Sequence, residues 1–389
     1  TDTSDINGDG FPDRIYFNYN NNYNQWEVQL NNGNSFDASI AWSNIEGFHE
    51  QSSYTSVRAF NYQPPVWGTI DLFDINGDGK ADRIIYIPSE GPYRWYVQLN
   101  RGNNSFASHI DWNNVQYDTH GSEGYIRTGG DSVYFTTFDI NGDGLPDHLM
   151  NHDNGDWEVQ FNNGKGFENI QMWGQIDGPS SSWQVFFNGD PVYVSISDIN
   201  GDGLPDRVMR NFNSEFGDWQ IQINNSHGFE PVVFWGPIEH NGDYKRVHIR
   251  ADYDPTIVDF FDINGDGLPD RVMRGYSSYD HWDVQLNNGP FPDLLNRVEN
   301  GIGGSATITY KPFIGQDNTK AADKSDLGFP VYVVTTIQTQ DGRGESYTTT
   351  LTYDKGKFDY LEREFSGFGK VRVTDAESNY SIKYFLQGN

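Results

Sequence analysis

The chain has 389 residues, of which 55 are Asp or Glu and 26 are Lys or Arg, so its formal net charge is −29. This charge disfavours a nucleic-acid partner, because binding phosphates requires clustered Lys and Arg. Cysteine is absent, which excludes disulfides, thiolate zinc sites and cysteine nucleophiles.

The remaining composition favours an all-β protein. The chain contains 42 Gly and 17 Pro, and 15% of its residues are aromatic. Turn formers and aromatic residues in these amounts are typical of many short strands joined by tight turns. No run of about 18 apolar residues occurs, so we expect no transmembrane helix. No signal peptide opens the sequence, which begins TDTSDINGDG, and we expect a mature fragment or a piece of a longer protein.

An acidic loop is the first element in chain order, and it recurs. It begins at Asp5, and further copies begin at Asp74, Asp139, Asp198 and Asp262, so the copies are 59 to 69 residues apart. The thirteen residues DINGDGLPDRVMR at 198–210 return letter for letter at 262–274. Self-similarity at this period is the signature of a repeat architecture.

Two tryptophan motifs follow the loop in each unit. A W-x-V-Q-like strand begins at Trp26, Trp95, Trp157, Trp219 and Trp282, and a shorter segment ends at Trp42, Trp112, Trp173 and Trp235 in four of the five units. In the fourth unit, strands are predicted over 191–197, 207–210, 219–223 and 230–235. Four antiparallel strands in about 64 residues form one propeller blade. The competing fold is a β-solenoid, whose coils are normally much shorter.

The acidic loop, D-x-N-G-D-G-x-x-D, has the composition of a calcium site. Oxygen side chains stand at positions 1, 3, 5 and 9, Gly at position 6 allows a sharp bend, and the carbonyl of position 7 can face the same centre. Oxygen ligands without nitrogen or sulfur favour Ca²⁺, and closely packed carboxylates repel one another without a cation. We therefore expect about five Ca²⁺ ions, one per loop, each a structural staple and not part of an active site.

An EF-hand does not explain the loop. Its position 12 should be a bidentate Glu, but this chain has apolar strand residues there: Tyr16, Ile85, Met150, Met209 and Met273. The flanking segments are also predicted to be strands. In each loop the expected ligands are the side chains at positions 1, 3, 5 and 9 and the backbone carbonyl at position 7, which is the fourth residue of each set below. The sets are Asp5, Asn7, Asp9, Phe11 and Asp13; Asp74, Asn76, Asp78, Lys80 and Asp82; Asp139, Asn141, Asp143, Leu145 and Asp147; Asp198, Asn200, Asp202, Leu204 and Asp206; and Asp262, Asn264, Asp266, Leu268 and Asp270.

These five loops resemble the FG-GAP/VCBS type of propeller repeat, which also occurs in integrin α subunits. The resemblance covers about residues 1–290 and implies calcium ligands at the same loop positions. The predicted fold is a β-propeller of four-stranded blades, five with calcium loops and six in all, followed by a β-rich segment at 291–389.

The C-terminal segment resembles a bacterial toxin component. LLNRVENGIGGSATITYKP (294–312), FPVYVVTTIQTQDGRG (329–344) and YLEREFSGFGKVRVTD (360–375) are similar to the B component of insecticidal Tc toxin complexes and Rhs-like virulence proteins. The resemblance implies a secreted bacterial protein whose propeller docks onto a pore-forming A component, and a following region that begins a hollow shell for a toxic payload. No YD-type Rhs repeats follow and no N-terminal domain precedes Thr1, so we expect a fragment or a shortened relative.

Other side chains offer weaker candidates. The recurring Trp residues are expected to pack in and between blades, although surface Trp can bind sugars; unrepeated aromatics such as Trp67, Trp183, Tyr276 and Tyr279 are better binding candidates. His148 and His152 share a strand face, but two His without a third ligand are a weak metal site. His148 stands where other loops have Arg14, Arg83, Arg207 and Arg271, which could pair with loop carboxylates. Nothing singles out Asp153, Asp156 and Glu158 as catalytic acids.

Three functions are compatible with the sequence. The preferred one is a non-catalytic, calcium-stabilised propeller that acts as a protein-interaction module of a secreted Tc/Rhs-like toxin, bound to an A-like subunit or another toxin component. One alternative is a propeller lectin that binds cell-surface glycans. Another is a propeller polysaccharide lyase or hydrolase, although no GxSxG, HExxH or phosphate-binding loop is present.

Closure of the propeller needs a further strand. Because the chain starts at a loop, blade one is expected to lack its first strand, and an open propeller exposes strand edges. Residues 291–389 contain several strand-like runs, so we predict that they return to complete a sixth, calcium-free blade. The alternative is a separate β-domain.

Overall fold

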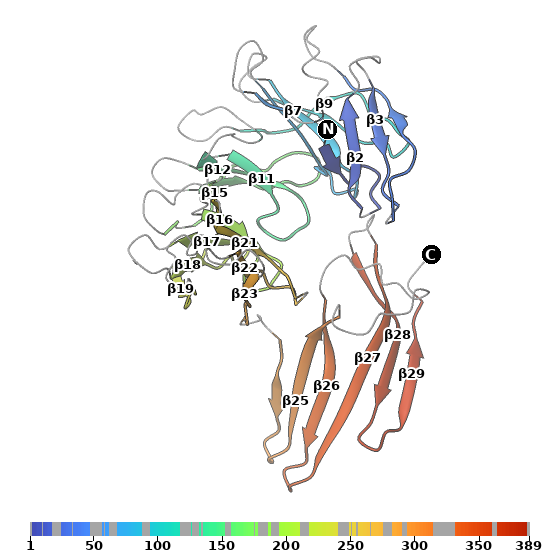
Figure 1. The fold of residues 1–389 in the computed structure, drawn as a ribbon, viewed down its shortest axis with the longest axis vertical. Coiled ribbons are helices and arrows are strands. Elements are labelled where there is room, and N and C mark those ends of the chain that lie inside the picture. The colour runs from blue at the N-terminus through green and yellow to red at the C-terminus, as the bar shows by residue number, and fades with distance from the viewer. Residues whose placement is uncertain are drawn as a thin grey trace. The chain divides into compact units, whose positions relative to one another are not determined.

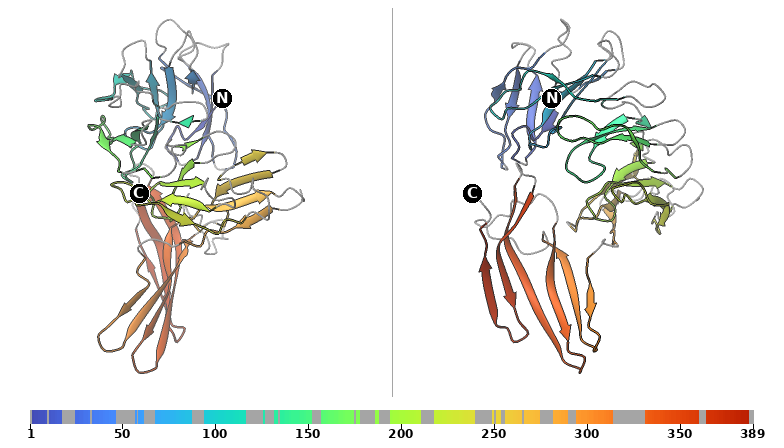
Figure 2. Two further views of the ribbon diagram at one scale, coloured as in Figure 1. Left: turned by 90° about the vertical axis from the view of Figure 1, so that its left-hand side faces the viewer. Right: turned by 180° about the vertical axis from the view of Figure 1, so that it is seen from behind.

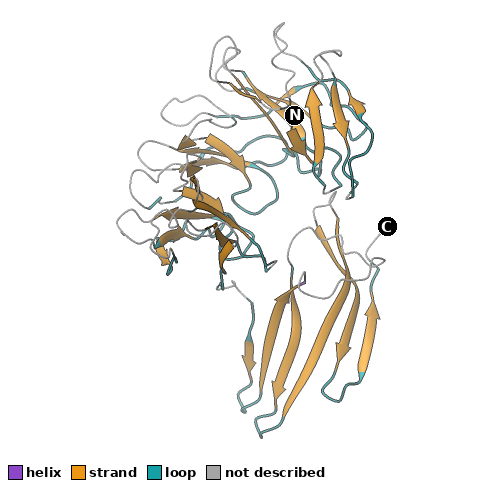
Figure 3. Cartoon of the chain, in the orientation of Figure 1, coloured by secondary structure: helices purple, strands orange, loops and turns teal. Residues whose placement is uncertain are grey.

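The structure is a computed structural model of the chain. All of the regular elements in its described part are β-strands (Figures 1 and 3). No helix capable of crossing a membrane occurs among these residues. The predicted all-β class is confirmed. The structure describes residues 2–9, 11–17, 25–32, 34–46, Val57, 59–61, 68–87, 94–116, Ile126, 132–133, 135–151, 157–174, 176–177, 186–187, 194–210, 218–239, Ile249, 251–253, 256–264, 266–274, 282–289, 294–313, 331–359 and 364–386.

Five sheets carry the repeat, and the strands of each follow chain order. Neighbouring strands in the first four sheets are antiparallel, as expected of propeller blades. A pair formed by β10 (Ser132–Val133) and β15 (Phe186–Phe187) lies outside them. The blades are β1 (Asp2–Ser4), β2 (Asp13–Phe17), β3 (Trp26–Gln29) and β4 (Ile40–Trp42); β5 (Ala59–Asn61), β6 (Gly68–Phe73), β7 (Asp82–Tyr86), β8 (Trp95–Gln98) and β9 (Ile110–Asp111); β11 (Phe135–Phe138), β12 (Asp147–Asn151), β13 (Trp157–Gln160) and β14 (Gln171–Met172); β16 (Val194–Ser197), β17 (Asp206–Arg210), β18 (Trp219–Gln222) and β19 (Val233–Trp235); and β20 (Ala251–Tyr253), β21 (Thr256–Phe261), β22 (Asp270–Arg274) and β23 (Trp282–Gln285).

The first blade is complete, which corrects one expectation. Its first strand, β1, pairs with β2 so that Asp2 lies opposite Ile15 and Ser4 opposite Asp13. Blade one was predicted to lack this strand because the sequence reaches the loop after only four residues. Three residues are enough, because the loop fixes the register of the strand pair and brings the chain back beside itself.

Each acidic loop joins two neighbouring strands of its blade, and blades one, two and three share the same register. The residue before the loop lies opposite the Asp at position 9: Ser4 opposite Asp13, Phe73 opposite Asp82, and Phe138 opposite Asp147. Side chains of a strand alternate between its two faces, so a fixed register sends equivalent residues to the same face in every blade.

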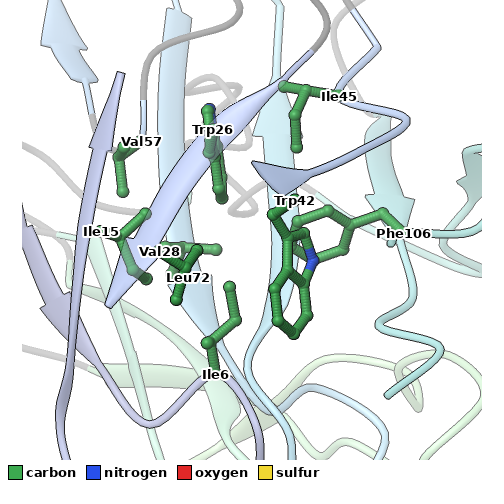
Figure 4. Packing of buried hydrophobic residues seen from close by; sticks show 9 residues of the cluster. All are labelled: Ile6, Ile15, Trp26, Val28, Trp42, Ile45, Val57, Leu72 and Phe106. Carbon is green, nitrogen blue, oxygen red and sulfur yellow. The ribbon is translucent and has the colours of Figure 1, made fainter. Parts of the chain in front are cut away.

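Adjacent blades pack through aromatic side chains. In the first core cluster, Trp26, Val28 and Trp42 of blade one meet Phe106 of blade two (Figure 4). The Phe106 ring lies edge-on to Trp26, with the ring centroids 5.5 Å apart. This is a favoured geometry for aromatic pairs. The same contact recurs between Trp95 and Phe167 and between Trp157 and Phe229.

The predicted burial of the recurring tryptophans is confirmed in most copies. Both motifs are buried in the first three blades, and in the fourth blade Trp219 is buried and Trp235 half-buried. Trp282 is 55% exposed, so its assignment to the core was wrong. Trp26, Trp95 and Trp157 are each covered by a Phe of the following unit. No further W-x-V-Q unit follows Trp282 in the sequence.

The two ends of the repeat present unburied versions of the same residues. Phe36 of blade one, equivalent to Phe106, is 48% exposed. In blade five, Ile263 and Val284 are 46% and 43% exposed, although their equivalents in blade one, Ile6 and Val28, are fully buried. The burial of these residues therefore comes from a neighbouring blade and not from their own.

The C-terminal residues form a separate six-stranded sheet in chain order. Its strands run side by side in Figures 1 and 2, coloured orange to red. An aromatic group made by Phe313, Tyr353 and Phe368 packs within it. The strands are β24 (Arg297–Glu299), β25 (Ser305–Pro312), β26 (Tyr332–Gln340), β27 (Ser346–Asp359), β28 (Glu364–Thr374) and β29 (Tyr380–Tyr384).

The chain divides into two compact units, one of residues 1–198, 203–259 and 273–283 and one of residues 199–202, 260–272 and 284–389. The missing first strand that motivated a ring-closing role for 291–389 is present as β1. The division at residue 290 and the sixth blade stay predictions.

The aromatic contact between blades predicts that removing this Phe costs much more stability at a buried position than at an exposed one. Phe106→Ala should lower the free energy of unfolding by about 3–5 kcal/mol, because it opens a cavity against Trp26. The matched control is Phe36→Ala, which changes the same repeat position where the ring is 48% exposed and should cost about 1 kcal/mol or less. Urea unfolding followed by tryptophan fluorescence measures both. Equal losses in the two variants would contradict the assigned interface.

Candidate metal sites

Two glycines shape the backbone of acidic loops two, three and four. Position 6 has a positive φ of 87° in Gly79 and 85° in Gly144, as the sequence predicted for the sharp bend. Position 4 is also left-handed, with φ of 80° in Gly77 and 79° in Gly142, which the sequence analysis missed. These three loops are therefore bent twice.

The first carboxylate of the loop holds this bent backbone in place. In loop two, Asp74 Oδ1 accepts hydrogen bonds from the amides of Gly77 and Asp78 at 2.8 and 3.1 Å. Its Oδ2 accepts the amide of Gly79 at 2.7 Å. Asp139 makes the same three hydrogen bonds in loop three. A side chain that satisfies three successive amides makes position 1 a structural residue whether or not a metal is bound.

Positions 3, 5 and 7 are linked to one another. In loop three, Asn141 Oδ1 accepts the amide of Asp143 at 2.9 Å, and Asn141 Nδ2 donates to Asp143 Oδ2 at 3.1 Å. Asp143 Oδ1 accepts the amide of Leu145 at 2.9 Å. Equivalent bonds to position 7 are made by Asp9, Asp78 and Asp266.

The Asp at position 9 lies buried between two backbone amides. Asp147 Oδ2 accepts the amide of Ile140 at 3.1 Å, and Oδ1 accepts the amide of Asn162 at 2.9 Å. Because Asn162 follows the third strand, this carboxylate ties the loop to the strand beyond the hairpin. Asp13, Asp82 and Asp270 repeat the arrangement.

Negative charge is concentrated at this buried position. Burial raises the pKa of Asp147 to about 7, although its amide hydrogen bonds oppose the shift. Repulsion by Asp143 and Asp139 is part of the same shift in pKa. Burial is also the largest cause of the raised pKa values of Asp13, Asp82 and Asp270. A bound cation would oppose the shift in pKa, since it supplies the opposite charge that the carboxylates lack.

The donor set of each loop fits a hard divalent cation. Carboxylate, carboxamide and carbonyl oxygens are the ligands that Ca²⁺ prefers, and the predicted positions 1, 3 and 5 are brought together in one turn beside position 9. Among the described residues, no three His, Cys, Asp or Glu side chains form a ready-made metal cage, since the carboxylates accept amides of their own loop. The groups that would hold calcium are the side chains at positions 1, 3, 5 and 9 and the carbonyl of position 7.

Consecutive loops are in contact. Asn100 Nδ2, just after strand β8 of blade two, donates to the carbonyl of Ile6 in loop one at 2.7 Å. The same bond joins Asn162 to Ile75 and Asn224 to Ile140, both at 2.7 Å. The sequence signal was the Asn that closes each W-x-V-Q-x-N motif, to which the sequence analysis assigned no role.

Arg83 and Arg207, which follow loops two and four, bind the preceding blade. Arg207 Nη1 donates to Gln222 Oε1 at 2.9 Å and to the carbonyl of Asp177 at 2.8 Å. Its guanidinium lies 5.7 Å from the Trp157 ring of blade three, and burial lowers its pKa to about 9. Arg14 donates to Gln29 in the same way. The suggested pairing with loop carboxylates was wrong for these residues, because the Gln of the W-x-V-Q strand lies directly opposite the arginine.

Among the described residues, the remaining candidates do not form a second site. His148 is buried, with its ring 4.8 Å from Trp95 and packed near Phe135 and Phe167, which agrees with a structural role. Glu158 is also buried. The other candidates lie outside the described residues: Trp67, His152, Asp153, Asp156, Trp183, Tyr276 and Tyr279.

Two family models match parts of the chain. Residues 239–387 match the insecticide toxin TcdB middle/N-terminal region. Residues 74–150 match an FG-GAP-like repeat. The resemblance to Tc toxin B components and FG-GAP repeats is confirmed. No curated protein matches the chain.

A solved structure shares the fold of this chain. The Photorhabdus luminescens Tc holotoxin pore is 20% identical, with a TM-score of 0.58 over 98% of this chain. This chain spans 18% of the length of that one. The TcdB2-TccC3 structure without its hypervariable C-terminal region is 16% identical, with a TM-score of 0.49 over 98% of this chain and 18% of that one. An Agrocybe aegerita lectin that recognises non-reducing terminal N-acetylglucosamine is 18% identical, with a TM-score of 0.48 over 99% of this chain and 84% of the lectin.

The position-9 carboxylate predicts a stability loss that does not depend on metal. With excess chelator, Asp147→Ala should lower the free energy of unfolding by about 2–5 kcal/mol, because two buried amides lose their acceptor. The control is Asp111→Ala, which removes an exposed carboxylate 3.6 Å from Arg94 and should change stability by about 1 kcal/mol or less. Denaturant melts at neutral pH measure both. A loss in Asp147→Ala no larger than the control would refute this role.

Proposed function

We propose that this chain is a calcium-stabilised β-propeller that serves as a protein-interaction module of a secreted Tc-type toxin component and is not itself an enzyme. The observation that carries the proposal is the match of residues 239–387, which contain blade five and the C-terminal sheet, to the TcdB middle/N-terminal region, in a chain whose residues 74–150 match an FG-GAP-like repeat. The fold shared with the Tc holotoxin pore over 98% of the chain supports it.

The use of the repeated residues supports a scaffold role. Trp, Phe and Arg at equivalent positions pack blade against blade, and the acidic loops bind their own amides. Catalysis needs one set of reactive groups, whereas these residues recur because every blade needs the same internal contacts. The partner we propose is a pore-forming A-like subunit or another component of the toxin complex.

The C-terminal sheet is consistent with the start of a shell. Its strands β27 and β28 are 14 and 11 residues long, whereas most blade strands have six residues or fewer. Long strands of this kind build extended walls, not compact blades. We propose that this sheet begins the Rhs-like region that would enclose a payload in the whole toxin.

The glycan alternative gains no support from the tryptophans that are buried between blades. Trp42, Trp112 and Trp173, three of the four recurring residues that could have lined sugar sites, are buried, and the fourth, Trp235, is half-buried. A sugar ring needs an exposed aromatic face to stack upon. Glycan binding is therefore retained as an outcome of the test below and not as a second proposal.

Removal of calcium should destabilise the protein. We expect a chelator to lower the melting temperature and added Ca²⁺ to restore it, because an ion that binds only the folded state stabilises it by mass action. Elemental analysis should find about five calcium ions per chain, one per loop. Asp202→Ala should remove one ion and weaken one blade. An unchanged melting temperature in chelator, with no calcium found, would refute the calcium proposal.

Binding to the toxin complex tests the proposed role. The chain should bind an immobilised Tc A component, and an excess of it should block docking of the intact B–C component, because both would use the same propeller surface. The chelated chain, measured in parallel, separates loss of fold from loss of the binding surface. Absence of competition at tens of micromolar would contradict the proposal, and selective retention on a glycan array would replace it by the lectin function.

A further inference from the structure

Loop two differs from the other four at position 7. It carries Lys80, where the others carry the apolar residues Phe11, Leu145, Leu204 and Leu268. The Lys80 ammonium lies 3.6 Å from Asp78 Oδ2 and 3.5 Å from the Asp78 carbonyl oxygen. Asp78 is position 5 of the same loop and one of the expected calcium ligands. A positive charge of the protein thus already lies beside one ligand of this site.

Packing confines the Lys80 side chain. A Cβ atom on Gly8 of loop one would lie 3.2 Å from Lys80 Cγ, and one on Gly102 would lie 3.0 Å from Lys80 Cε. The stem therefore crosses two glycines that leave room for it, and the side chain is only 20% exposed. An ammonium on a stem held in this way cannot move far into solvent, as the head of a free surface lysine does.

Loop three shows the same slot filled by an apolar side chain. Leu145 lies over Gly77 and Gly164, the equivalents of Gly8 and Gly102. A Cβ on Gly77 would be 2.8 Å from Leu145 Cδ2, and one on Gly164 would be 3.9 Å from Leu145 Cδ1. Lys80 and Leu145 thus occupy equivalent positions between consecutive loops, and they differ chiefly in charge.

We propose that Lys80 makes loop two the weakest of the five calcium sites and acts there as a built-in counter-ion that holds the loop when calcium is scarce. The inference rests on the proposed calcium binding. A fixed ammonium repels an incoming divalent ion and competes with it for Asp78, and charge near the ligands is a main determinant of calcium affinity. In the metal-free protein, the same ammonium reduces the repulsion among the carboxylates of the loop.

The experiment counts and ranks the sites in the full chain. Metal-stripped protein is titrated with Ca²⁺ and followed by native mass spectrometry and calorimetry. We expect four tighter sites and one weaker site, with the weaker one about tenfold lower in affinity. Asp78→Ala should abolish only the weaker site, which would assign it to loop two. Lys80→Leu and Lys80→Gln should bring all five sites into one class, whereas Lys80→Arg should keep the weaker site.

The reverse substitution in loop three and a second measurement, the melting temperature, test the proposal independently. Leu145→Lys should create a second weak site in loop three. Melting temperatures should show that calcium stabilises Lys80→Gln more than it stabilises the unaltered chain, because the variant loses its counter-ion in chelator and gains a stronger ion when loaded.

Five sites of equal affinity in the unaltered chain would overturn the proposal. So would a weak site that persists in both Lys80→Leu and Lys80→Gln. If no calcium binds to any form, the calcium proposal itself is refuted, and this inference is refuted with it. That outcome is distinct, because equal sites would leave calcium binding intact and remove only the role of Lys80.

Discussion

The buried carboxylate at position 9 of each acidic loop is the interaction on which the rest of a blade depends. Asp147 accepts one amide from the loop and one from the residue after the third strand, so it fixes three strands with one side chain. The next group along, the carboxamide of Asn162, reaches the loop of the preceding blade. The loop therefore connects the strands of its own blade and also connects two blades. Bound calcium would reinforce a connection that hydrogen bonds already define.

Apolar side chains also connect adjacent blades. The register of β2 and β3 places Trp26 and Val28 on one face of blade one, where Phe106 of the next blade covers them. Burial in this architecture is consequently a property of pairs of blades. This explains why identical motif residues are buried in the middle of the repeat while Trp282 and Phe36, at its two ends, are largely exposed.

The pattern within one unit predicted the loops and strands well. The errors concern burial and hydrogen-bond partners, which depend on neighbouring segments of the chain. The loops, the W-x-V-Q strands and the burial of Trp26 and Trp95 follow from composition and alternation within one unit. The exposure of Trp282 depends on the absence of a following unit, and the partner of Arg207 depends on strand register, which no single segment encodes. The strand at Asp2–Ser4 was missed because its pairing is set by the loop and not by β-propensity. The calcium ligands could be proposed from residue type alone, since the loop is contiguous in sequence.

The contacts between blades are directional, and this has a consequence for how such a chain can evolve. Asn100, Phe106 and Arg83 of blade two all reach back to blade one, and their equivalents in later blades do the same. Each unit therefore carries both the side chains that contact the preceding blade and the surface that the following blade contacts. Duplication of one unit within a gene inserts a blade that already fits both neighbours, without compensating substitutions. The letter-for-letter identity of 198–210 and 262–274 is what such growth by copying would leave behind.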